Sequence, residues 1–119
     1  MIKDKSTEKR VQLGRQIQEV ENKIDELSHE KRKHEDFLDE QASQLKQQHR
    51  KLGELNQRLH GLGDKQAERV AYENQAIYEA LNRNFNRQVQ ELDEAYRITQ
   101  NQMEEERERL NTERGNLPW

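Results

Sequence analysis

The sequence predicts an all-α protein, an antiparallel two-helix coiled-coil hairpin that can complete a helical bundle with a partner or by dimerisation. Apolar residues recur at seven-residue spacing in each half of the 119-residue chain, and glycines separate the two halves. A seven-residue apolar repeat places one narrow stripe of a helix against another helix. Two such helices joined by a short turn form an αα-hairpin, and the whole of 1–119 is expected to be one such hairpin.

The composition agrees with an extended coiled coil and excludes several other classes. Only 29% of the residues are hydrophobic and 38% are charged, whereas a compact globule uses about 45–50% apolar residues. Disorder is the competing interpretation of such a composition, but the net charge is only -3 and the apolar residues are periodic. The chain has no cysteine, which excludes disulfides and thiolate metal sites.

The first helix is expected from about residue 6 to residue 60. Ser6 or Thr7 can cap its start. Gln41 and Gln48 fall at core-type positions, where polar side chains fix register at a cost in stability. The apolar residues expected in the hairpin seam are Leu13, Ile17, Val20, Ile24, Leu27, Leu38, Leu45, Leu52, Leu55 and Leu59.

The turn is expected at 61–64, the second helix from about 65 to 114, and a tail at 115–119. Gly61 or Gly63 can take the left-handed conformation that closes a helix, and Asp64 can cap the next one. An eleven-residue interval among the sevens, from Leu81 to Leu92, is expected to relax a left-handed supercoil locally. The seam residues expected from this helix are Leu81, Val89, Leu92, Tyr96, Met103 and Leu110.

No enzymatic activity, catalytic residue, cofactor or metal site is expected. Two helices side by side enclose no pocket of convergent polar groups, and the four histidines lack the three- or four-residue spacing of a helical metal pair. The one basic run, residues 31–34, is followed by acids that can pair with it, so nucleic acid is not an expected partner. No stretch approaches the roughly 18 apolar residues of a membrane span, and the expected location is the cytoplasm.

The second helix carries more apolar residues than one seam can cover, which indicates contact with a further helix. This helix can belong to a second copy of the chain or to a helical domain of another protein. The residues expected to bind such a partner are Tyr72, Ile77, Phe85 and Ile98, together with the terminal Trp119.

The second half, notably residues 84–87, 92–97 and 103–110, resembles the small helical accessory proteins encoded beside LXG toxins in Gram-positive type VIIb secretion loci. This resemblance implies a hairpin that packs on the N-terminal helical domain of a toxin, commonly with a second small helical protein, and targets the toxin for export. This sequence departs from two motifs of the secretion system. The turn reads His60-Gly61-Leu62-Gly63 where related secreted hairpins have Trp-X-Gly, and Tyr96 is followed four residues on by Gln100 rather than by an acid. The resemblance therefore implies an adaptor, with co-export beside its partner left open.

Two other classes remain open. A two-helix coiled coil also resembles the flagellar export stalk protein FliJ, a coiled-coil chaperone that inserts into an ATPase ring. The third class is a self-associating structural coiled coil. Neighbouring genes would discriminate the three: an LXG toxin gene supports the first class, flagellar or type III genes support the second, and neither leaves the third.

Overall fold

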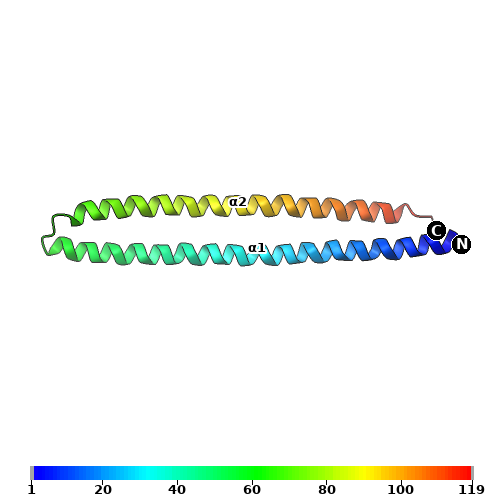
Figure 1. The fold of residues 1–119 in the computed structure, drawn as a ribbon, viewed down its shortest axis with the longest axis horizontal. Coiled ribbons are helices and arrows are strands. Elements are labelled where there is room, and N and C mark those ends of the chain that lie inside the picture. The colour runs from blue at the N-terminus through cyan, green and yellow to red at the C-terminus, as the bar shows by residue number, and fades with distance from the viewer. Residues whose placement is uncertain (1, 119) are drawn as a thin grey trace. The chain divides into compact units, whose positions relative to one another are not determined.

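The computed structural model describes residues 2–118, with side chains from residue 5 onward. It contains two α-helices, α1 (Ile2–Gly61) and α2 (Ala67–Gly115), and the described residues form no strand (Figure 1). The all-α helical hairpin predicted from the sequence is confirmed. The helix bounds differ from the expectation, because α1 already includes Ile2 and the turn spans 62–66.

The end of α1 is closed by a Schellman motif. Asp64 N donates to Leu59 O over 3.0 Å and Gly63 N donates to His60 O over 3.1 Å. Gly63 has a φ of 86°, the left-handed conformation that glycine adopts without steric cost. The carboxylate of Asp64 then accepts from Gln66 N at 2.8 Å, just before α2 begins. The sequence prediction of a glycine closure followed by a capping aspartate holds at the atomic level.

Replacing Gly63 by alanine is expected to destabilise the hairpin by about 1–2 kcal/mol, because a Cβ is strained at positive φ. Gly61→Ala is the matched control: its φ is not in the left-handed region, and a Cβ there meets nothing within 4 Å. Urea unfolding of the two variants measures the difference. Equal stabilities would mean that the turn does not need the left-handed conformation.

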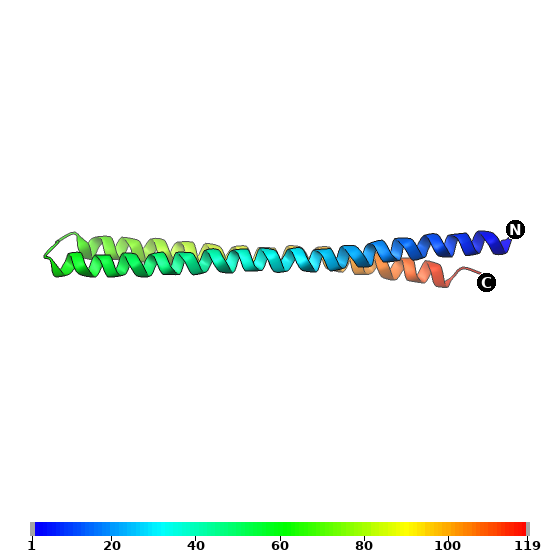
Figure 2. The same ribbon diagram turned by 90° about the horizontal axis from the view of Figure 1, so that it is seen from below.

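The helices form two compact units, each built from one segment of α1 and one of α2 that lie side by side and antiparallel (Figures 1 and 2). The terminal unit comprises the residues up to Arg32 and those from Leu92 onward, and the turn unit comprises Lys33–Glu91.

The terminal unit has an apolar core whose members follow the seven-residue spacing. Arg10 closes its open end, since Arg10 Nη2 donates to the carbonyl oxygens of Leu117 and Pro118, each at 3.0 Å. Further along, Lys31 Nζ lies 4.0 Å from Asp93 Oδ1. The buried core residues are Leu13, Ile17, Val20 and Leu110, with Ile24, Met103 and Leu117 packed against them. Tyr96 is also buried, and Leu27 and Leu92 are half-buried.

Candidate interaction surface

The seam of the turn unit is polar in its middle. Asn56 is buried at 7% exposure, and Ala67 is buried at the start of α2. His49 is half-buried, its ring stacks on Tyr78 with centroids 4.0 Å apart and planes 9° apart, and His49 Nε2 donates to Gln75 Oε1 over 2.9 Å. The hairpin contact here therefore includes polar and aromatic groups beside the half-buried Leu38, Leu45 and Val89.

This seam repeats every eighteen residues, which is five whole turns of an α-helix. Leu38 and Asn56 on α1 are eighteen residues apart, and so are Ala67 and Phe85 on α2; all four are buried or half-buried. The contact line thus follows the 3.6-residue period of a straight helix. The heptad that contains the expected leucines leaves this line, whereas Glu35, Ala42, His49 and Asn56, also seven residues apart, stay on it.

Four residues expected in the seam are exposed, and the heptad expectation is wrong for them. Leu52, Leu55, Leu59 and Leu81 are 46%, 51%, 36% and 40% exposed. A heptad stripe drifts about 20° per heptad around a straight helix. Over the three heptads from Leu38 to Leu59 the drift is about 60°, which turns the later leucines out of the contact. Gln48, also expected in the seam, is exposed, whereas Leu45 and Val89 remain half-buried.

The exposed apolar residues occupy equivalent positions on the two helices. On α1, Leu52, Leu55 and Leu59 lie four residues before, one before and three after the buried Asn56. Phe37, at 59% exposure, lies five turns before Leu55 and so shares its side of α1.

On α2, Val70 lies three residues after Ala67, Ile77 one before Tyr78, and Leu81 four before Phe85. Two antiparallel helices are related by a local two-fold axis perpendicular to the plane that contains them. Residues at the same offset from the seam therefore lie on the same side of that plane. We call this surface the apolar face; its members are Phe37, Leu52, Leu55, Leu59, Val70, Ile77 and Leu81.

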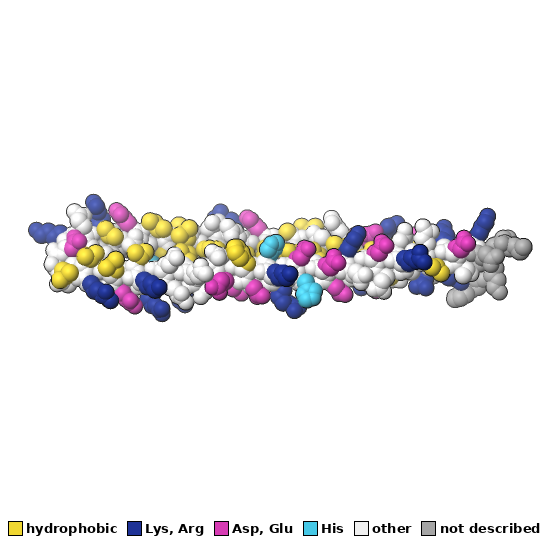
Figure 3. All heavy atoms as spheres, turned by 60° about the horizontal axis from the view of Figure 1, so that its bottom comes forward, with side chains coloured by type: hydrophobic (Ala, Val, Ile, Leu, Met, Phe, Trp, Pro, Cys, Tyr) yellow, Lys and Arg dark blue, Asp and Glu magenta, His cyan; other side chains and the backbone are white. Residues whose placement is uncertain are grey.

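Figure 3 shows apolar side chains gathered over the half of the molecule that contains the turn, along the line where the two helices meet. Contiguous exposed apolar surface of this kind marks sites of protein–protein contact. The turn adds Leu62, which is 82% exposed.

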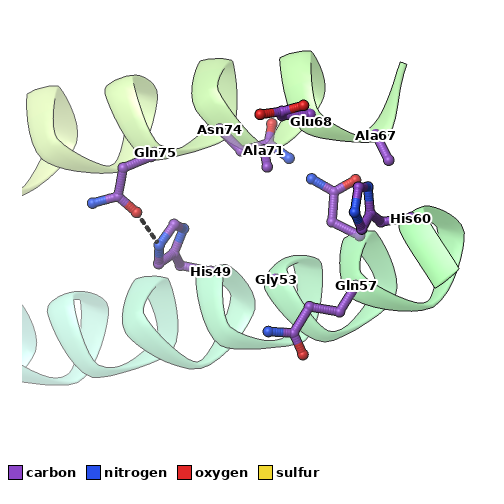
Figure 4. Close-up of a pocket in the computed structure, with 10 residues that line it drawn as sticks. His49, Gly53, Gln57, His60, Ala67, Glu68, Ala71, Asn74 and Gln75 are labelled. Carbon is purple, nitrogen blue, oxygen red and sulfur yellow. Dashed lines mark hydrogen bonds between the residues drawn. The ribbon is translucent and has the colours of Figure 1, made fainter. Parts of the chain in front are cut away.

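The opposite side of the turn unit is a groove lined by polar side chains together with Ala67 and Ala71. Residues at the opposite offset from the seam line it, among them Gly53, Gln57 and His60 of α1 and Glu68 and Gln75 of α2 (Figure 4). In Figure 4 the His49 ring and the Gln75 amide point toward one another across the groove. Two unlike surfaces thus flank the same pair of helical segments.

The residues expected to bind a partner do not form one surface. Phe85 is half-buried in the seam. Tyr72, at 79% exposure, lies about 140° around α2 from Ile77 and so points away from the apolar face. Ile98 is 46% exposed but belongs to the terminal unit, and Trp119 lies outside the described residues. Of these residues, Ile77 is the member of the apolar face.

Sequence reasoning assigned the α1 leucines of this face, Leu52, Leu55 and Leu59, to the seam. Asn56, whose burial only the structure shows, lies eighteen residues after Leu38 on a line that competes with the leucine heptads. The heptad pattern alone assigns the leucines to the core and leaves this polar residue on the surface.

Side chains of the terminal unit have shifted pKa values. Arg97 Nη2 donates to Glu94 Oε1 at 2.6 Å, and this hydrogen bond lowers the pKa of the Glu94 carboxyl. Burial raises the pKa of the Tyr96 hydroxyl, and the charge of Glu30 adds to this. The Glu94–Arg97 pair is exposed and contributes little to stability.

The raised pKa of Tyr96 predicts a loss of stability in alkali. Because the folded pKa exceeds the unfolded value of about 10, folding favours the neutral phenol; this stabilisation is complete below about pH 10 and is lost as the pH rises through the folded pKa. Urea unfolding between about pH 8 and pH 11 should show a steeper decline for the wild type than for Tyr96→Phe. Tyr72→Phe is the control at an exposed tyrosine, and a decline identical in all three proteins would contradict the prediction.

Within the described residues, neither helix has a segment apolar and long enough to span a bilayer. Among the same residues, no three His, Cys, Asp or Glu side chains come together in a way that could hold a metal ion.

Comparison with protein families, with curated proteins and with solved structures finds no match for this chain.

Proposed function

We propose that this protein is a non-enzymatic helical adaptor that binds helices of a second protein with the apolar face of its turn unit. The observation that supports this is the exposure of Leu55 and Ile77, at 51% and 57%, at matching positions on the two helices. A hydrophobic groove between two helices receives the apolar side of an amphipathic helix, whose anchoring residues lie at i, i+3, i+4 and i+7. The terminal unit has its own buried core.

The partner we propose is the N-terminal helical domain of an LXG toxin of a type VIIb secretion system, with a second small helical protein as a further partner. The resemblance of residues 84–110 to the accessory proteins of these toxins supports this choice. In this role the adaptor covers apolar helices of the toxin that are unstable in water and offers a composite surface to the export machinery. Binding takes place in the cytoplasm before export.

The test is an affinity pull-down of the tagged protein from its native cells, with mass spectrometry of the proteins recovered. We expect the wild type to recover an LXG toxin. The Leu55→Glu variant should recover less than about a tenth as much toxin, because burying a glutamate in an apolar contact is costly. Tyr72→Glu is the matched control, since Tyr72 is more exposed and lies off the apolar face. Recovery of an export ATPase would instead support the stalk class, and equal recovery by the two variants would exclude the apolar face as the binding surface.

A further inference from the structure

Lysines border the apolar face along α1. Lys51 lies five residues before the buried Asn56, which places it just beyond Leu52 and Leu55 on the same side of the helix. Lys33 lies eighteen residues, or five whole turns, before Lys51 and therefore at the same angle around α1. Both lysines are exposed. The α1 border of the apolar face is therefore positively charged at Lys33 and at Lys51.

Glutamates border the same face along α2. Glu73 lies five residues before Tyr78, the offset that Lys51 has from Asn56, and Glu91 follows Glu73 by five whole turns. Both are exposed. Glu73 also lies 3.8 Å from Arg69 in an exposed pair within α2, and a carboxylate has lone pairs for a second cation. The α2 border of the apolar face is therefore negatively charged at Glu73 and at Glu91.

The positive and negative positions are level with each other along the hairpin. His49 lies opposite Gln75, as their hydrogen bond shows. Because the helices are antiparallel, Lys51, two residues after His49, lies at the same height along the hairpin as Glu73, two residues before Gln75. Lys33, sixteen residues before His49, lies at the same height as Glu91, sixteen residues after Gln75. Each lysine of one border thus has a glutamate of the other border at its own height.

This arrangement is self-complementary, and we infer that a second copy of this chain occupies the apolar face. A two-fold axis parallel to the helices places α1 of one copy over α2 of the other, keeps every residue at its own height, and brings both turns to the same end. Lys51 of each copy then meets Glu73 of the other, and Lys33 meets Glu91. The apolar members of the two faces form the interior of a four-helix bundle.

The alternative two-fold axis, perpendicular to the helices, is disfavoured by the same charges. It places α1 over α1 and α2 over α2, so that lysines border one contact and glutamates the other. Like charges at the rim of an interface oppose association, whereas opposite charges select the register. The positions of Lys33, Lys51, Glu73 and Glu91 therefore favour the axis parallel to the helices.

This dimer shares a surface with the proposed function, but the inference rests on the charged borders, which the proposed function does not use. In the absence of a partner the dimer covers the apolar face. A partner helix has to displace the second copy, so partner binding and dimerisation exclude each other at this surface.

Sedimentation equilibrium with charge reversals tests the dimer. The purified wild type is expected to populate monomer and dimer in a concentration-dependent equilibrium. Lys51→Glu should raise the dissociation constant by about tenfold, since two equivalent pairs change from attraction to repulsion, and the double variant Lys51→Glu, Glu73→Lys should restore it. Lys46→Glu is the matched control, because Lys46 borders the opposite side, near His49 and Tyr78.

A second measurement tests the symmetry. The chain has no cysteine, so Lys65→Cys in the exposed turn introduces a single thiol. With both turns at the same end, this variant is expected to form an intermolecular disulfide under mild oxidation at concentrations where the wild type is dimeric. Circular dichroism of every variant checks that helicity is unchanged.

A monomer at all concentrations, a dimer that ignores Lys51→Glu, or a dimer of the Lys65→Cys variant that does not cross-link would each overturn the inference. These results are distinct from failure of the proposed function, which is read from the toxin in the pull-down. Lys51→Glu weakens the dimer without removing an apolar side chain, so it should preserve or increase toxin recovery, whereas Leu55→Glu should abolish both contacts.

Discussion

Replacing Leu13 by alanine is expected to lower the free energy of unfolding of the terminal unit by about 2–4 kcal/mol. Leu13 is 4% exposed and packs in the cluster with Ile17, Val20 and Leu110. Removal of a buried leucine costs the transfer free energy of its side chain and leaves a cavity. Few other side chains are available to fill that cavity in a two-helix core, so the loss is large relative to the total stability of a small domain.

The matched control is Leu55→Ala, because Leu13 and Leu55 occupy the same position of the leucine heptad. Leu55 is 51% exposed, and at concentrations where the protein is monomeric its loss should change the stability by no more than about 0.5 kcal/mol. Urea unfolding, with amide hydrogen exchange to locate the effect in one unit, measures both variants. Equal losses would show that Leu55 packs in the seam as the heptad alone predicts.

Replacing Asn56 by leucine is expected to stabilise the turn unit by about 1–2 kcal/mol. Asn56 is buried at 7% exposure in the seam, where a polar side chain lowers stability in exchange for register. Leucine has a similar size and adds apolar contact with α2. Thermal unfolding and amide exchange of the turn unit measure the gain.

Gln57→Leu is the control for Asn56→Leu, because it introduces the same side chain at the neighbouring exposed position. It should leave the stability almost unchanged in the monomer. A decrease in stability for Asn56→Leu would mean that the amide contributes more to the seam than its desolvation costs.

The elements of this fold were predictable because their causes are local. The Schellman closure at Gly63 and the cap at Asp64 depend on residues within one turn of each other. The terminal seam was predictable as well, since the seven-residue spacing of Leu13 and Val20 on α1, and of Met103 and Leu110 on α2, coincides with the residues that pack there.

The seam of the turn unit was not predictable from the leucines, because its position depends on how far the helices supercoil. Supercoiling is a property of the two packed helices together, whereas a heptad assignment made from α1 alone takes it for granted. Where the contact follows an eighteen-residue period, Leu52 and Leu59 rotate outward and Asn56 rotates inward. The same rotation explains why Ile77 was assigned to the surface whereas Leu52, Leu55 and Leu59 were assigned to the seam.

The eighteen-residue period of the turn unit has a consequence for which helices it accepts. A helix that lies along a straight groove keeps its contacts only if its own apolar residues follow the 3.6-residue period, for example at i, i+4, i+7, i+11 and i+18. A strict heptad helix loses register with such a groove by about 20° per heptad. The proposed partner helix is therefore expected to keep its apolar residues at the 3.6-residue spacing along the full length of the apolar face.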